Sequence, residues 1–132
     1  MSSQRLFLIV ALAYLQFAGC YRSAGPQLAP VTGTVTLDGK PLDRATVMFQ
    51  PASGRPSFGT TDKDGNYAMR YTIERLGVMP GTSTVSITSV VEDDQGNKVR
   101  GELLPRKYHS QTELTADVQA QANVFDFKLV SK

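Results

Sequence analysis

The strongest constraint on the fold is the run Val-Thr-Gly-Thr-Val-Thr-Leu at residues 31–37, in which threonines alternate with mostly apolar residues. Successive side chains of a strand point to opposite faces of a sheet, so this period of two predicts a β-strand with one buried face. Asp38-Gly39 follows at once, and glycine tolerates the positive φ that a tight hairpin turn requires. An alternating return strand over Ala45–Gln50 predicts that the domain opens on a β-hairpin.

Similar segments recur along the chain, separated by turn residues such as Gly, Pro, Asn and Asp. A second hairpin is predicted to pair Ser57–Thr61 with Tyr67–Tyr71 across the turn Asp62–Asn66. No segment has the periodicity of a helix. The seven predicted strands are 31–37, Ala45–Gln50, Ser57–Thr61, Tyr67–Tyr71, Thr82–Val91, Thr112–Val118 and Asn123–Val130. This pattern predicts an all-β protein built as a seven-stranded antiparallel β-sandwich.

The first 19 residues have a different character from the predicted strands. Arg5 precedes an apolar run, Leu6–Leu15, and small residues follow it. This order is typical of an export signal, and the apolar run is too short to cross a bilayer as a helix. Removing residues 1–19 from the 132-residue chain leaves 113, enough for one domain with its own core. We therefore expect a signal peptide at 1–19, a linker at 20–30 and one β domain at 31–132.

The junction Phe17-Ala18-Gly19-Cys20 resembles the bacterial lipobox, and Cys20 is the single cysteine of the chain. The resemblance implies cleavage between Gly19 and Cys20 and acylation of the cysteine with palmitate-type chains. It also implies an exported lipoprotein that is anchored to a membrane and faces the periplasm or the cell surface. The alternatives are an ordinary secretory leader or an uncleaved anchor.

Three segments of the predicted domain resemble the carboxypeptidase regulatory-like domain. They are Val31–Leu42, Ala45–Pro51 and Thr60–Tyr67. The resemblance implies a transthyretin-like sandwich of the Greek-key type, a fold that occurs as an accessory module in many contexts. Later segments resemble small bacterial lipoproteins that carry this domain alone; they are Val78–Thr82, Leu104–Tyr108 and Asn123–Leu129.

The residues that could carry catalysis are few. His109 is the single histidine, so it alone could act as the imidazole base of a serine triad. Cys20 lies outside the predicted domain and is expected to be acylated, which removes it as a nucleophile. We therefore expect no catalysis by this chain alone and no cofactor.

The turn Asp62-Lys-Asp-Gly-Asn66 is a weak candidate for a metal site, because Asp62, Asp64 and Asn66 alternate like the first ligands of a calcium loop. An EF-hand has glycine at the sixth position and a bidentate glutamate at the twelfth. Here glycine is fourth and the twelfth residue is Ile73. We favour a hairpin turn in which these residues supply local hydrogen bonds.

Val99–Gln111 is the longest irregular stretch. Its part Val99–His109 is the candidate contact loop, because long loops on rigid domains often carry recognition. Its candidate contact residues are Arg100, Arg106, Lys107, Tyr108 and His109. Tyr108 could instead pack on the edge of the sandwich, and we favour that alternative. A formal net charge of +2, with acidic residues near the basic ones, argues against a nucleic-acid partner.

Three hypotheses for function follow from these expectations. The first is a lipid-anchored envelope module with a structural role or a contact to proteins or glycans. The second is an accessory subunit of an envelope enzyme or transporter. The third is a carrier of calcium or a small ligand.

Overall fold

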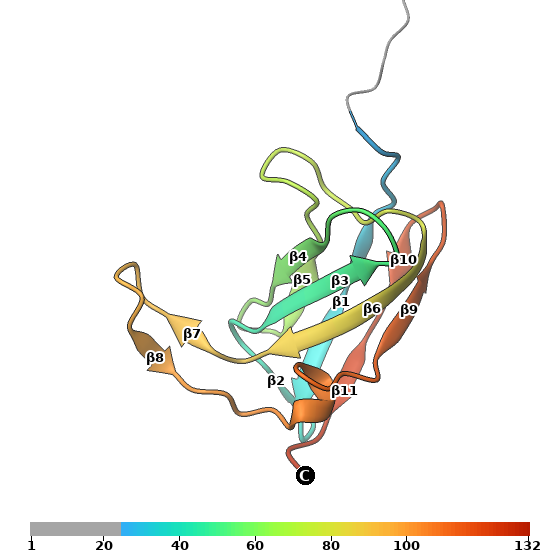
Figure 1. The fold of residues 1–132 in the computed structure, drawn as a ribbon. Helices are drawn as coiled ribbons and strands as arrows, with labels where there is room; N and C mark the ends of the chain where they lie inside the picture. The colour runs from blue at the N-terminus through green and yellow to red at the C-terminus, as the bar shows by residue number, and fades with distance from the viewer. Residues whose placement is uncertain (1–24) are drawn as a thin grey trace, which may run out of the picture.

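A computed structural model describes residues 25–132, so the predicted leader and Cys20 lie outside the described residues. The described part is all-β apart from one 3-10 turn, and two main sheets face each other across a shared core (Figure 1). Within it, no helix is long and apolar enough to cross a membrane.

The first sheet is organised around β1 (Val31–Leu37), which has neighbours on both of its edges. On one edge, β5 (Asn66–Ala68) and the two-residue β2 (Lys40–Pro41) pair with it in antiparallel fashion. On the other edge, β10 (Asn123–Val124) and β11 (Phe127–Leu129) pair with it in parallel.

The second sheet is antiparallel throughout and has the strand order β4-β3-β6-β9. Its strands are β4 (Ser57–Thr60), β3 (Thr46–Pro51), β6 (Gly81–Thr88) and β9 (Thr115–Val118). A separate small hairpin of β7 (Val91–Glu92) and β8 (Lys98–Arg100) projects from the end of β6, and the 3-10 turn η1 (Arg106–Tyr108) follows it (Figure 1).

The sequence predicted antiparallel pairing throughout, and this prediction is wrong for the first sheet. Its last strand, split into β10 and β11, runs parallel to β1. The direction of the last strand follows from the position at which β9 ends. Val118 pairs with Gly81, and the preceding Val78 bonds to Ala29 just before β1. The chain therefore leaves β9 at the end of the sandwich where β1 begins, and the next strand runs alongside β1 in the same direction.

The two predicted hairpins are wrong in their pairing. The chain turns at Asp38-Gly39 as expected, but β1 pairs only with the short β2 before β3 crosses to the other sheet. In the second hairpin, β4 pairs with β3 while β5 pairs with β1. The two strands stay joined through one bridge, in which Phe58 and Arg70 exchange backbone hydrogen bonds of 2.9 and 2.7 Å. The seven-strand count differs too, because β2, β7 and β8 were not predicted and the last strand is split into β10 and β11.

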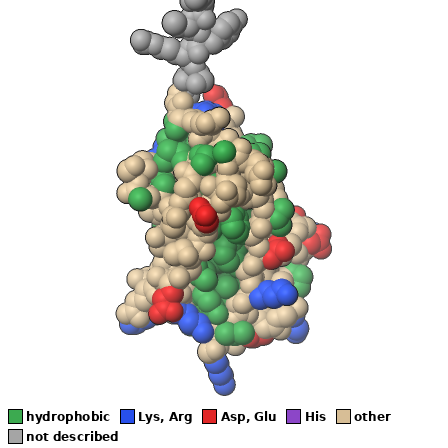
Figure 2. Space-filling view, turned by 90° about the vertical axis from the view of Figure 1, so that its right-hand side faces the viewer, with side chains coloured by type: hydrophobic (Ala, Val, Ile, Leu, Met, Phe, Trp, Pro, Cys, Tyr) green, Lys and Arg blue, Asp and Glu red, His purple; other side chains and the backbone are tan. Residues whose placement is uncertain are grey.

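The predicted burial of alternate side chains is largely confirmed. Ala45, Val47 and Phe49 of one segment are fully buried, as are Val85 and Ile87. Aromatic rings from the two sides of the sandwich meet in the core. The ring centroid of Phe49 lies 5.8 Å from that of Phe125 and 6.3 Å from that of Phe127. Hydrophobic side chains also reach the surface on the side of the molecule that carries β9 and β10 (Figure 2).

The folded part begins before Val31. Ala29, which the sequence assigned to a flexible linker, is 2% exposed and exchanges two backbone hydrogen bonds of 2.9 Å with Val78. Pro26 also contacts the domain, since its carbonyl accepts a hydrogen bond of 2.7 Å from Arg75.

The break between β10 and β11 faces Gly33. There the carbonyl oxygen of Phe125 approaches so closely that a Cβ on Gly33 would lie 1.8 Å from it. That same carbonyl accepts a hydrogen bond of 2.6 Å from the Tyr67 hydroxyl. Asp126 then bonds back to Thr34, accepting from both its amide and its hydroxyl. A glycine is thus needed opposite the break.

We expect Gly33→Ala to lower the free energy of unfolding by roughly 3 kcal/mol, because the methyl group must displace the Phe125 backbone. Urea unfolding monitored by circular dichroism would measure the loss. Gly101→Ala is the matched control, since a Cβ there meets nothing within 4 Å. Equal stability of the two variants would contradict the steric role assigned to Gly33.

Candidate functional site

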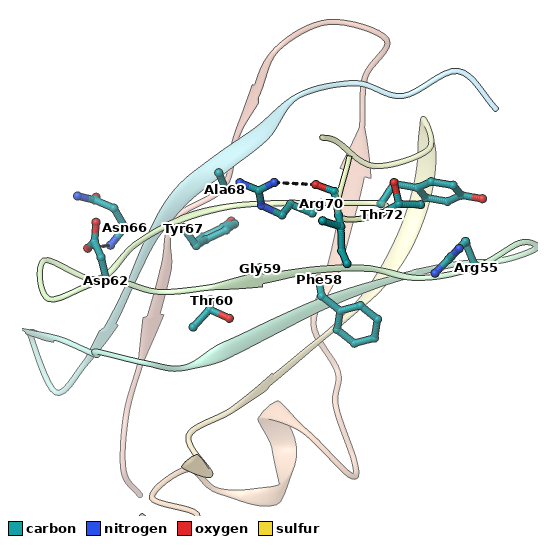
Figure 3. A pocket seen from close by; sticks show the side chains of 12 residues that line it. Arg55, Phe58, Gly59, Thr60, Asp62, Asn66, Tyr67, Ala68, Arg70 and Thr72 are labelled. Carbon is teal, nitrogen blue, oxygen red and sulfur yellow. Dashed lines mark hydrogen bonds between the residues drawn. The ribbon is translucent and has the colours of Figure 1, made fainter. Parts of the chain in front are cut away.

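A groove of the described domain lies where β4 and β5 separate into different sheets. It has a volume of about 700 Å³. Twelve residues of β4, β5 and the flanking loops line it: Arg55, Phe58, Gly59, Thr60, Asp62, Asn66, Tyr67, Ala68, Arg70, Tyr71, Thr72 and Ile73. Asp62 and Asn66 lie at one end of the groove and Arg55 at the other (Figure 3).

The two strand edges that border the groove have no further strand beside them. In the described sheets, β4 has β3 on one side and β5 has β1 on one side. Only the bridge between Phe58 and Arg70 connects them, so between that bridge and the turn at Asp62 their edges face the groove. Unpaired strand edges present backbone donors and acceptors to any extended ligand.

The apolar side chains at the groove are more exposed than a core would allow. Phe58 is 47% exposed and Ile73 is 91% exposed. Leu76, at the end of the same loop as Ile73, is 58% exposed. Exposed apolar residues that gather beside polar ones are typical of contact surfaces.

Tyr71 is flanked by two arginines at the mouth of the groove. The guanidinium of Arg55 lies 5.2 Å from the centre of its ring, and that of Arg75 lies 5.8 Å away. Both distances are within the range of cation–π attraction. Arg70 points toward the same loop and donates a hydrogen bond of 3.2 Å to the carbonyl of Ile73 (Figure 3). This end of the groove is therefore cationic and aromatic.

Tyr67 forms the inner wall of the groove and is 4% exposed. Burial, with a smaller contribution from the nearby Asp126 carboxylate, raises the pKa of Tyr67 well above its ordinary value. The phenol therefore stays protonated and donates its hydrogen bond to Phe125. Through this bond Tyr67 connects β5 to the last strand across β1.

Asp62, one of the weak metal candidates, organises its own turn. Its Oδ1 accepts hydrogen bonds from the amides of Asp64, at 2.9 Å, and Asn66, at 3.0 Å. Asp93 does the same in the turn between β7 and β8, where it accepts from Gln95 and Asn97. The repeated pattern identifies a turn geometry that Asp and Gly residues favour. In the described residues, no group of three or more His, Cys, Asp or Glu side chains could hold a metal ion.

The candidate contact loop is tied to the domain over much of its length. Tyr108 is 8% exposed and its hydroxyl accepts a hydrogen bond of 3.1 Å from the Val130 amide, so it packs on the sandwich, the alternative that the sequence favoured. His109 bonds through Nε2 to the carbonyl of Leu104, at 3.0 Å. Arg100 donates to the carbonyls of Ser89 and Arg44. Arg106 and Lys107 are exposed on η1.

Glu102 connects this loop to the end of β6. Its side chain, 24% exposed, accepts hydrogen bonds from the Ser89 amide at 2.9 Å and the Ser89 hydroxyl at 2.7 Å. Thr88 and the Leu104 amide also donate to it. Burial alone would raise the pKa of Glu102, but these hydrogen bonds outweigh it and the pKa is lowered.

Ser89, Glu102 and His109 lie together but are not arranged as a catalytic triad. The Ser89 hydroxyl is directed at Glu102, not at His109, and Ser89 is 0% exposed. His109 lies 4.0 Å from the far oxygen of Glu102. A nucleophilic serine needs an imidazole as its base and an open path to substrate. This cluster has neither, and its geometry anchors the loop.

The groove itself was missed by sequence reasoning. Phe58 was assigned to a predicted strand, and Ile73 lay outside all of the predicted strands. The expected hairpin between β4 and β5 would have closed the gap between the two strands. The usable signal was the pattern Tyr71 to Leu76, where two apolar residues stand among charged ones in a loop without a strand pattern.

Comparisons with solved structures found distant likenesses, of which two are described here. One is to the crystal structure of a DUF3823 family protein from Parabacteroides merdae, with a TM-score of 0.49 and 10% identity over 80% of this chain and 47% of that chain. The other is to a 9R-lipoxygenase from Cyanothece, with a TM-score of 0.38 and 15% identity over 79% of this chain and 16% of that chain. The chain thus spans less than half the length of either protein. No family model and no curated protein matches the chain.

We expect Glu102→Gln to destabilise the domain by about 1 kcal/mol at pH 7, because an amide cannot accept all the hydrogen bonds of a partly exposed carboxylate. Since the pKa of Glu102 is lowered by folding, its contribution exists above the unfolded pKa of about 4.3 and is lost as pH falls through the folded value. Thermal melts of both proteins between pH 7 and pH 3 would measure it. A stability difference that persists unchanged at pH 3 would contradict the role of the carboxylate.

Proposed function

We propose that this protein is a lipid-anchored module of the bacterial cell envelope that contacts a protein or glycan through the groove between β4 and β5. The proposal includes the finer assignment to a carboxypeptidase regulatory-like, transthyretin-like sandwich, which rests on the motif residues at 31–42, 45–51 and 60–67. In this proposal the module binds a partner and does not catalyse a reaction by itself.

The anchor is supported by sequence alone. An apolar leader, small residues at 18 and 19 and a single cysteine at position 20 stand in the order of a lipobox. The described domain begins to make contacts at Pro26, a few residues later. Acyl chains add roughly 0.8 kcal/mol per buried methylene, so two or three of them would hold the module stably.

The contact role is supported chiefly by one observation, the exposed aromatic and cationic side chains along two open strand edges. Phe58 supplies an apolar contact. Tyr71 supplies an aromatic ring, and Arg55, whose guanidinium lies over that ring, supplies a positive charge. Aromatic and arginine side chains are enriched where proteins bind partners. An extended segment of a protein, or a sugar chain that stacks on the exposed Phe58 ring, fits this chemistry.

The proposed anchor predicts that the protein takes up labelled palmitate in cells and that Cys20→Ala abolishes the label. The reason is that Cys20 carries the only thiol in the chain. Gel fluorescence after an alkyne-palmitate pulse would measure it, and Ser23→Ala is the control that should keep the label. Label that persists in Cys20→Ala would overturn the anchor.

The proposed contact predicts that a photo-crosslinker at the groove captures a defined envelope component. Phe58 replaced by p-benzoylphenylalanine keeps the aromatic character of a side chain that is 47% exposed. Val99, 60% exposed on β8 in the candidate contact loop, is the matched position. We expect crosslinked bands from position 58 and none from position 99. Bands from position 99 alone would reject the groove in favour of the loop.

A further inference from the structure

We propose that the loop Tyr71–Leu76 docks on the surface of an anionic lipid bilayer, with Ile73 in the interfacial region and the neighbouring arginines against headgroup phosphates. The inference rests on the proposed anchor at Cys20 and adds a second contact between domain and membrane. That contact would fix how the domain is oriented above the lipid, which a chain tether alone does not do.

The loop lies at the end of the domain where the chain enters. In Figure 1 the segment before β1 and the loop that follows β5 share this end of the molecule. Arg75 joins them directly, because it donates a hydrogen bond of 2.7 Å to the carbonyl of Pro26. Gly25 comes five positions after Cys20, and such a segment spans at most about 18 Å when fully extended. An acylated Cys20 therefore keeps this loop close to the headgroups.

The side chains at the tip of the loop suit a lipid interface. Ile73 is 91% exposed and Leu76 is 58% exposed, so neither contributes much to the core. Insertion into the boundary between headgroups and acyl chains would remove this apolar surface from water. The exposed position of Ile73 is thus accounted for by a bilayer and not by packing within the domain.

The charges beside these residues complement an anionic surface. Three arginines surround the loop, with the Arg55 and Arg75 guanidinium groups at the Tyr71 ring and Arg70 bonded to the carbonyl of Ile73. Glu74 is the one acidic residue of the loop. Basic residues close to a membrane are attracted by anionic headgroups, and aromatic rings favour the same depth.

The loop is held in a fixed shape, so the exposed tip is presented without a large ordering cost. The Tyr71 amide donates to the carbonyl of Arg75 at 2.8 Å, and the Arg75 amide donates to the Thr72 hydroxyl at 3.0 Å. At its base, the Ser57 hydroxyl donates to the carbonyl of Gly77 at 2.8 Å. A preorganised contact surface loses less entropy on binding than a disordered one.

The test uses the absence of tryptophan from the chain. Ile73→Trp introduces a single fluorescent reporter at the tip of the loop. All residues of the core cluster lie between Ala29 and Leu129, so a chain of residues 20–132 retains the whole core. Its single thiol, at Cys20, is coupled to a maleimide lipid in vesicles of phosphatidylcholine with or without phosphatidylglycerol. The vesicle then supplies the anchor whether or not the cell acylates Cys20.

We expect the tryptophan emission of Ile73→Trp to shift to shorter wavelength on the phosphatidylglycerol vesicles and to be quenched by lipids that carry a nitroxide near the headgroup. On pure phosphatidylcholine the shift should be smaller. Val99→Trp is the matched control, because Val99 is also exposed, at 60%, but lies on the β7–β8 hairpin away from the anchored end (Figure 1). The emission of this control variant should stay as it is in solution.

Two results would overturn the proposal. Emission of Ile73→Trp that is unchanged on tethered vesicles would show that the loop does not enter the bilayer interface. Equal shifts for Ile73→Trp and Val99→Trp would indicate general adsorption of the domain and no oriented docking. Because the tether is chemical, neither result depends on the palmitate experiment, so the anchor and the docking can fail separately.

Discussion

The fold depends on the close approach of the Phe125 backbone to Gly33 at the centre of β1. At this point the last strand stops pairing, its carbonyl accepts the Tyr67 hydroxyl at 2.6 Å, and Asp126 bonds back to Thr34. Tyr67 belongs to β5 on the opposite edge of β1, so one set of contacts fastens both edges of the central strand. The first and last strands of the domain are thereby joined around one glycine, and the aromatic core closes over them.

The longer strands were predictable from the sequence, but their partners were not. Alternation of side chains is a local property, so Val31–Leu37 and the buried faces at Ala45–Phe49 and Val85–Ile87 could be found from the sequence. Pairing is set by contacts between distant residues. The parallel last strand depends on Ala29 meeting Val78 and on Asn123, whose amide donates to Pro30, and no local pattern carries that information.

The same distinction explains the candidate site. The chemistry of the turn at Asp62 could be expected from its residue types, since Asp and Gly supply the same hydrogen bonds again at Asp93. The groove could not be expected from the sequence, because it forms only where β4 and β5 enter different sheets beyond the bridge between Phe58 and Arg70. A sequence that turns tightly between two short strands predicts a closed hairpin. Here β5 pairs with β1 and β4 pairs with β3, so the two strands belong to different sheets and the surface between them stays open.

Each end of the domain carries a loop that hydrogen bonds hold in place, and the loop at the chain-entry end carries the most exposed large apolar side chain of the described residues. At the end far from Gly25, the Glu102 carboxylate accepts hydrogen bonds from the amides and hydroxyls of its neighbours, and Tyr108 is buried against the domain. At the end where the chain enters, the loop is equally well bonded internally, yet its apolar tip is directed into solvent at Ile73. Both loops leave a large apolar side chain in water, but Ile73 is 91% exposed and Leu103 is 50% exposed. A rigid loop with an exposed isoleucine, joined through Arg75 to the segment that leads to Cys20, is the arrangement expected of a surface built to be covered.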